Sequence, residues 1–117
     1  MTKFSDRIKK SAKTSPIILA NDYDPKIPNI ESKTLRNIKL LNNYLCGIKI
    51  NFHLLLQLDR KQISKINKNA HDYGLQCIAD IKLNDIGNTN FITAENLWNM
   101  GFDAVIVNPI MGKKSLK

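Results

Sequence analysis

The sequence lacks any apolar run that approaches the ~20 residues of a membrane-spanning helix. Residues 1–14 are polar and basic without an apolar centre, unlike a secretory signal. The glycine-rich GxGxxG pattern and the GxxxxGKS/T phosphate loop are also missing, which weakens the case for a nucleotide-binding open sheet. We therefore expect a cytoplasmic protein with no membrane-inserted segment.

Cysteine is scarce, and the chain is short. Cys46 and Cys77 lie far apart in separate apolar runs, without a CxxC partner or a nearby histidine, which favours buried free thiols over a disulfide or a metal site. A chain of 117 residues suits one domain over residues 1–117. A complete eight-fold βα barrel is excluded, because it typically needs about 250 residues.

Acidic residues are outnumbered, since 18 Lys and Arg against 10 Asp and Glu give a net charge of +8. The lysines are spread along the chain with only short runs at 9–10 and 113–114, and the few aromatic residues do not alternate with them. Nucleic-acid binding is therefore the less favoured interpretation of this charge. An anionic substrate or an acidic partner is equally compatible with it.

Four short apolar runs, rich in Ile or Val and bounded by polar residues, are typical of strands buried on both faces of a parallel sheet. Their starts recur at roughly 30 residues, the length of one βα unit. The predicted strands span residues 16–22, 45–51, 76–82 and 103–108.

Helical patterns fill the intervals between these runs. The predicted helices span residues 4–12, 32–44, 54–73 and 90–100, with Ser32 as the cap of the second and Trp98 and Met100 in the core. The resulting βαβαβαβ order fits a sheet of sequential strands that curls as in a barrel. It also fits a doubly wound open sheet, and periodicity does not separate the two.

Charged residues gather at the ends of the predicted strands. Asp22 follows the first strand, Lys49 lies in the second, and Asp80 and Lys82 end the third, with Asp85 beyond them in a loop. The carboxyl ends of parallel strands converge, and buried charges are costly unless paired. We therefore expect an alternating cluster of carboxylates and ammonium groups. The D-x-K-x-x-D spacing alone is common in solvated charge runs, and its position after an apolar strand is what indicates a site.

The order of residue types in these segments is more specific than the spacing of their charges. The segment IADIKLNDIGNTN, residues 78–90, closely resembles the third-strand signature of orotidine 5′-monophosphate decarboxylases, D-x-K-x-x-D followed by Ile-Gly or Ile-Pro and a Thr. The segments IILANDYD, CGIKINF and GFDAVIVNPIMGKKSL resemble the family's first, second and fourth strands. The resemblance covers residues 13–116 and implies an α/β fold, the N-terminal half, or four βα units, of a TIM (β/α)8 barrel.

Two related groups, the keto-gulonate-phosphate decarboxylases and the hexulose-phosphate synthases, share the D-x-K-x-x-D frame. They usually follow it with Thr-Gly or Ala-Gly rather than the Ile-Gly-Asn-Thr of residues 86–89, and they tend to use a metal. The resemblance therefore favours orotidylate decarboxylase, which converts orotidine 5′-phosphate to UMP and CO₂, and implies no cofactor or metal. A related enzyme of these two groups remains the alternative.

The resemblance also implies roles for single residues. Lys82 would protonate the pyrimidine C6 as CO₂ departs, and Asp80 would hold Lys82 beside the substrate carboxylate. Lys49 would pair with Asp80 and reach the ribose, and Asp22 would accept a hydrogen bond from a ribose hydroxyl. The remaining motif residues would reach across a dimer into the neighbouring subunit's site. There Asp85 would be a catalytic residue, and Ile86 and Thr89 would bind the substrate.

The chain departs from the family at three positions and lacks half of its length. Asn51 replaces a Gly, His53 stands where Pro is common and is expected to be solvated, and Asn108 replaces a His. The loops that would grip the substrate phosphate follow the seventh and eighth strands, which are absent. We therefore expect a second polypeptide to supply the C-terminal half-barrel. A truncated chain and a non-catalytic half-barrel binding or scaffold protein are the alternatives.

Overall fold

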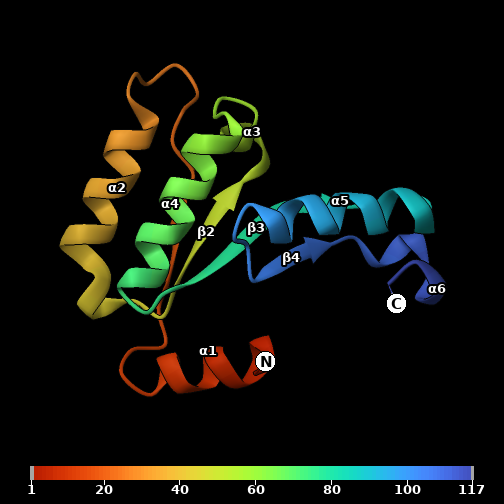
Figure 1. The fold of residues 1–117 in the computed structure, drawn as a ribbon, viewed down its shortest axis with the longest axis horizontal. Coiled ribbons are helices and arrows are strands. Elements are labelled where there is room, and N and C mark those ends of the chain that lie inside the picture. Colours follow the sequence, from red (N-terminus) through yellow and green to blue (C-terminus); the bar gives the residue numbers. More distant parts are fainter. Residues whose placement is uncertain (1, 117) are drawn as a thin grey trace.

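The computed structural model describes residues 2–116, which form a single four-stranded parallel sheet (Figure 1). Neighbouring strands pair in the order in which they occur along the chain, namely β1 Ile18–Asn21, β2 Gly47–Asn51, β3 Gln76–Leu83 and β4 Ala104–Val107. This sequential order confirms the half-barrel prediction. It excludes the doubly wound sheet, because in that fold the strand order reverses at a switch point.

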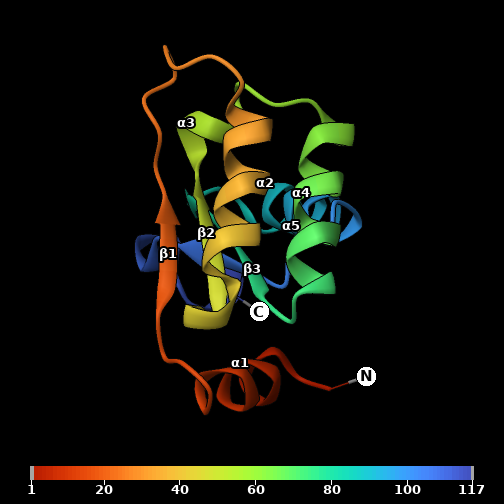
Figure 2. The same ribbon diagram turned by 90° about the vertical axis from the view of Figure 1, so that its left-hand side faces the viewer.

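The helices that connect the strands lie on one side of the sheet (Figures 1 and 2). They are α2 Ile30–Leu41, the single turn α3 Phe52–Leu55, α4 Arg60–Asp72 and α5 Gly87–Asn99. The first helix, α1 Phe4–Ala12, crosses the end of the sheet where the strands begin, and α6 Lys113–Leu116 follows a 3-10 turn after β4. No helix within residues 2–116 is both long and apolar enough to cross a membrane.

The core lies between the sheet and the helices. Ile48 and Ile50 of β2 are fully buried there and pack with residues of α2, α3 and α4. Lys49 lies between them in sequence, and because side chains alternate along a strand it points to the opposite face. The same alternation in the other strands produces one face of helix-packed apolar residues and one face that no described helix covers.

The uncovered face carries exposed apolar residues as well as charged ones, and Ile106 pairs directly with Asp80 in the sheet. Ile18 of β1 and Ile106 of β4 are 42% and 37% exposed on it, and Ala20 is also exposed. β1 and β4 each pair with one neighbour only, so both edges of the sheet are open. This is the inner surface that a closed barrel would bury.

The predicted helix boundaries were wrong in three places, and one of these is α5, which begins at Gly87 rather than at residue 90. The expected helix 54–73 is two helices, because Asp59 and Gln62 form a capping box that starts a new one. The Asp59 side chain accepts from the Gln62 N–H at 2.8 Å, and the Asp59 N–H donates to the Gln62 side chain at 2.9 Å. The helix expected from 32 instead begins at Ile30, after Asn29 in the left-handed conformation, so Ser32 does not cap it.

The two residues near the end of α5 that were predicted to lie in the core differ in their burial. Met100 packs against the core. Trp98 was placed there wrongly, since it is 44% exposed and lines a groove with residues of α1. The helix turns by about 100° per residue, so positions two apart cannot both face the sheet squarely.

Candidate functional site

Asp80, near the carboxyl end of β3, is the centre of a charge cluster on the uncovered face of the sheet. Its side chain is only 7% exposed. One carboxylate oxygen accepts from the Lys49 ammonium and the other from the Lys82 ammonium, both at 2.8 Å. A buried carboxylate is costly unless both oxygens are satisfied, and here each has its own cation.

Asp22 extends this cluster through Lys49. The Lys49 Nζ lies 3.5 Å from an Asp22 carboxylate oxygen, while it donates to Asp80 on its other side. Asp22 directly follows β1, Lys49 belongs to β2, and Asp80 and Lys82 belong to β3. The structure therefore brings four of the predicted site residues together as a continuous row, Asp22, Lys49, Asp80 and Lys82, in which negative and positive charges alternate.

The pKa values of Asp80 and Lys49 favour their charged forms. Hydrogen bonds from Lys49 and then from Lys82 lower the pKa of Asp80, and they outweigh the burial that acts in the opposite direction. The hydrogen bond to Asp80 raises the pKa of Lys49, again against burial, and the Asp22 charge adds to it. Asp80 is thus held as a carboxylate and Lys49 as an ammonium at neutral pH.

The backbone at Lys82 is irregular, and this irregularity directs the Lys82 side chain toward Asp80. Its φ is +46°, a left-handed conformation that a lysine rarely adopts. The pairing of β3 with β4 shifts at the same point, from Asp80 opposite Ile106 to Leu83 opposite Val107. This bulge lets Lys82 fold back to Asp80 although its side chain is 68% exposed. A left-handed non-glycine residue costs on the order of 1–2 kcal/mol, and such strain concentrates at functional sites.

The other predicted site residues lie in the loop between β3 and α5, apart from this row. The Asp85 side chain accepts from the Ile86 N–H at 2.8 Å, and the buried Asn90 side chain brackets the Asp85 backbone with bonds to its N–H and C=O. Ile86 is 70% exposed and Thr89 is half-buried. Among the described residues, no hydrogen bond or ion pair joins Asp85 to the row, and its placement in a neighbouring subunit's site stays a prediction.

Sequence reasoning missed Asn90 and gave His53 the wrong surroundings, and both of these polar residues shape the neighbouring loops. Asn90 holds the loop that carries Asp85, and its only sequence signal is its place in the first turn of α5. His53 is not solvated as expected, since one ring nitrogen lies 2.9 Å from the Asn51 amide nitrogen and the other 2.9 Å from the Tyr23 carbonyl. Asn108 accepts from the Ile110 N–H, so it caps the turn after β4.

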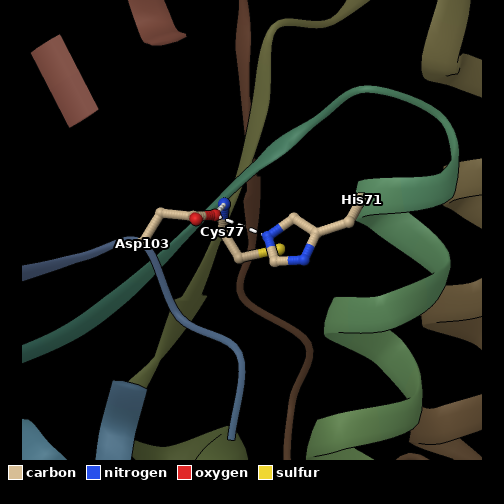
Figure 3. A group of neighbouring side chains, drawn as sticks. All are labelled: His71, Cys77 and Asp103. Atoms are coloured by element: carbon tan, nitrogen blue, oxygen red, sulfur yellow. Dashed lines mark hydrogen bonds and ion pairs between the residues drawn. The ribbon is translucent and has the colours of Figure 1, made fainter. Parts of the chain in front are cut away.

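A second polar cluster lies at the opposite end of the sheet, where β3 begins (Figure 3). His71, Cys77 and Asp103 offer ligand atoms within 4.8 Å of one another, a set that could in principle hold a metal ion. However, one Asp103 oxygen already accepts from the His71 ring and the Cys77 N–H, both at 2.7 Å. The other oxygen lies 3.3 Å from the Arg7 guanidinium, a cation that competes with any metal.

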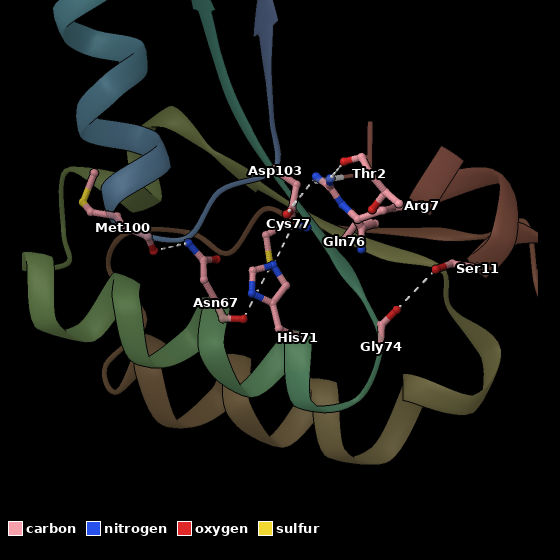
Figure 4. A network of polar contacts seen from close by, with 10 residues as sticks. All are labelled: Thr2, Arg7, Ser11, Asn67, His71, Gly74, Gln76, Cys77, Met100 and Asp103. Atoms are coloured by element: carbon pink, nitrogen blue, oxygen red, sulfur yellow. Dashed lines mark hydrogen bonds and ion pairs between the residues drawn. The ribbon is translucent and has the colours of Figure 1, made fainter. Parts of the chain in front are cut away.

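This second cluster is better suited to holding elements together (Figure 4). Arg7 of α1 donates both to Asp103 and to Gln76 at the start of β3, and His71 belongs to α4. Burial raises the pKa of the Cys77 thiol, which disfavours the thiolate that a metal needs. Hydrogen bonds from His71 and Cys77 lower the pKa of Asp103 although its burial acts to raise it.

Known proteins are similar to this chain over almost its whole length. The sequence model of the "Orotidine 5'-phosphate decarboxylase / HUMPS family" matches residues 15–117. The orotidine 5'-phosphate decarboxylase of Pyrococcus abyssi is 34% identical over 102 residues, covering 86% of this chain and 45% of the relative. That of Thermococcus kodakarensis is 33% identical over 104 residues, covering 88% and 45%. The chain thus spans less than half the length of these relatives.

Solved structures share the fold. The UMP synthase of Leishmania donovani superposes with a TM-score of 0.85 over 99% of this chain and 27% of its own, at 21% identity. The orotidine 5'-phosphate decarboxylase of Pyrococcus horikoshii gives a TM-score of 0.67 at 28% identity, covering 86% of this chain and 45% of its own. This chain therefore corresponds to only a part of each of these longer chains.

Proposed function

Since the chain belongs to the orotidine 5'-phosphate decarboxylase / HUMPS family, we propose that it decarboxylates orotidine 5′-phosphate to UMP and CO₂. In this proposal the chain is the part of the enzyme that bears the catalytic charges. The observation that carries it is the row of Asp22, Lys49, Asp80 and Lys82 at the carboxyl ends of three strands. The names of the curated relatives favour this reaction over that of a hexulose-phosphate synthase.

Lys82 is the proposed general acid. Loss of CO₂ from C6 of the pyrimidine leaves a carbanion with little resonance relief, so a fixed positive charge beside that carbon lowers the barrier. The Lys82 ammonium donates to Asp80 at 2.8 Å, which fixes its position. The same ammonium can then deliver a proton to C6.

Asp80 is proposed to act on the ground state. Its pKa is lowered by Lys49 and Lys82, so it stays ionised in a largely buried position. A substrate carboxylate placed beside it is repelled, and that repulsion disappears as neutral CO₂ leaves. Lys49 and Asp22 lie further along the row, where they are suited to donate to and accept from ribose hydroxyls.

The remaining parts of the site are proposed to come from other polypeptides. A C-terminal half-barrel would cover the apolar inner residues Ile18 and Ile106, pair with the open edges of β1 and β4, and supply the phosphate-binding loops. A second copy of the enzyme would receive Asp85, Ile86 and Thr89 in its own site, forming a dimer. The two buried free cysteines suit action in the reducing cytoplasm.

The test is a reconstitution. The chain is mixed with a polypeptide that carries strands five to eight, and the loss of orotidylate absorbance is followed. We expect turnover on mixing, its loss in Lys82→Ala, and its retention in Lys61→Ala, which removes an exposed lysine of α4. Equal turnover in Lys82→Ala would exclude the mechanism. A folded but inactive pair would favour the alternative, a half-barrel that binds or scaffolds without catalysis.

A further inference from the structure

We propose that His53 is a positioning residue: its neutral imidazole, protonated on Nε2, ties the segment that carries Asp22 to the end of β2. The tie itself is a property of the fold, and its importance for catalysis rests on the proposed function. His53 lies in the single turn α3, directly after the strand that carries Lys49. It is half-buried, and both of its ring nitrogens are engaged.

The bridge consists of three hydrogen bonds in series. The Phe52 N–H donates to the Asn51 side-chain oxygen at 3.1 Å. The Asn51 amide nitrogen lies 2.9 Å from His53 Nδ1. His53 Nε2 lies 2.9 Å from the backbone carbonyl of Tyr23, which is 30 residues away in sequence.

The directions of these bonds determine where the proton sits on the ring. A backbone N–H can only donate, so the oxygen of Asn51 must face Phe52 and its NH₂ must face His53. An NH₂ group only donates, so Nδ1 of His53 must accept and carry no proton. The Tyr23 carbonyl only accepts, so Nε2 must carry the proton. The neutral Nε2–H tautomer is the form that satisfies all three bonds.

The bridge spans the same two segments as the Asp22–Lys49 ion pair. Tyr23 directly follows Asp22, and Asn51 lies two residues after Lys49 on the same face of β2. On its other side, the Tyr23 hydroxyl accepts from the Asn37 side chain of α2. The segment after β1 is therefore held on one side by Asn37 of α2 and on the other by His53, which is bonded to the end of β2. We infer that these two contacts fix the distance between Asp22 and Lys49.

The bridge depends on the residue types at positions 51 and 53. A Gly at position 51 or a Pro at position 53 could not form the side-chain bonds that Asn51 and His53 make in the bridge. The polar pair Asn51 and His53 thus provides a tie that those residue types cannot provide.

Nitrogen-resolved NMR of the imidazole rings tests the tautomer directly. The chain has two histidines, so the variant His71→Gln leaves the signals of His53 alone. We expect the neutral ring to carry its proton on Nε2 only. Asn51→Asp replaces the NH₂ donor by an acceptor, so Nδ1 of His53 is then expected to carry a proton. A wild-type ring that carries its proton on Nδ1, or averages between both nitrogens, would overturn the proposal.

Hydrogen exchange tests the tie. The Ile27 N–H bonds to the Asp24 carbonyl and the Lys26 N–H to the Asp24 side chain, so both amides report on the segment after Asp22. In His53→Ala we expect their exchange to accelerate about fivefold, the equivalent of one net hydrogen bond. His53→Gln, whose amide can still donate to Tyr23, should restore slow exchange, and His71→Gln should leave it unchanged.

Unchanged exchange in His53→Ala would contradict the tie. Both measurements are made without substrate, so their failure is distinguishable from failure of the proposed decarboxylation. In an active assembly the tie predicts a higher KM for His53→Ala with a smaller change in kcat, because Asp22 is proposed to bind the ribose in ground and transition state alike.

Discussion

The two ends of the sheet each hold an aspartate surrounded by cations, but the surroundings differ. Asp80, at the carboxyl end, is engaged by side chains alone, the ammonium groups of Lys49 and Lys82, and one of these lies on a strained backbone. Asp103, at the amino end, accepts from a backbone N–H of β3 and from side chains of α1 and α4. The arrangement around Asp80 places charged side chains on an open surface, whereas the arrangement around Asp103 connects β3 with the helices α1 and α4.

The difference follows from the architecture. In parallel βα folds the loops after the strands converge over the carboxyl ends, where a substrate can be reached, whereas residues at the amino ends serve stability. The same residue type is therefore expected to matter for turnover at position 80 and for folding at position 103.

The largest expected effect is on turnover at the Asp80 end. Lys82→Ala in the reconstituted enzyme should lower kcat by at least about 10³-fold, because it removes both the fixed positive charge and the proton donor. Its free energy of unfolding should fall by no more than about 1 kcal/mol, because the Lys82 side chain is mostly exposed and its removal lets water reach the Asp80 oxygen that it leaves. A variant that folds and retains more than about a tenth of the rate would contradict the role of Lys82 as general acid.

The next effect is on stability at the Asp103 end. Asp103→Ala should lower the free energy of unfolding by about 3 kcal/mol, because it leaves the Cys77 N–H, the Arg7 guanidinium and the His71 ring without their acceptor. Asp80→Ala, the matched control, should cost no more than about 1 kcal/mol, since both lysines can turn to water. Urea unfolding measures both, and equal losses would contradict the contrast between the two ends.

A smaller effect isolates the backbone strain at Lys82. Lys82→Gly should be about 1 kcal/mol more stable than Lys82→Ala, because glycine adopts a φ of +46° without a Cβ penalty. Both variants should be inactive. If the glycine variant proved less stable than the alanine variant, the bulge at the end of β3 would not be strained.

The smallest effect is a pH dependence at the Asp103 end. The hydrogen bond to Asp103 raises the pKa of His71 above 6.5 in the folded state. Its contribution is therefore complete below pH 6.5 and is lost as the pH rises through the folded pKa. We expect a loss below about 1 kcal/mol, because His71 is partly exposed. Urea midpoints that fall equally with pH in wild type and His71→Gln would contradict this assignment.

Much of the fold could be predicted from the sequence. The buried strands are short runs rich in Ile, Val and other apolar residues, and their regular recurrence marks the βα units. The sequential strand order was not determined by periodicity and came from the resemblance. The break before Arg60 was missed because Leu54, Leu55 and Leu58 continue the helical spacing of Ile63, although the capping residues Asp59 and Gln62 were visible in the sequence.

The row of charges was predictable, but its detailed geometry was not. Asp22, Lys49 and Asp80 follow from their places at strand ends, since parallel strands in register bring those ends together. The left-handed backbone of Lys82 arises from pairing with β4, which no local pattern encodes. The His53 bridge joins residues 30 apart in sequence, so it depends on the tertiary fold. The proposed placement of Asp85 in a neighbouring subunit's site stays a prediction.

The central claim is that this chain carries the catalytic charges of a decarboxylase that is complete only with the other half of the barrel. The most direct measurement is a titration of a polypeptide carrying strands five to eight into the chain, with the initial rate of orotidylate decarboxylation recorded. The account predicts negligible turnover without the second half and a rate that rises to a plateau at equimolar mixing. Plateau-level turnover by the chain alone, or none by a fully folded pair, would contradict it.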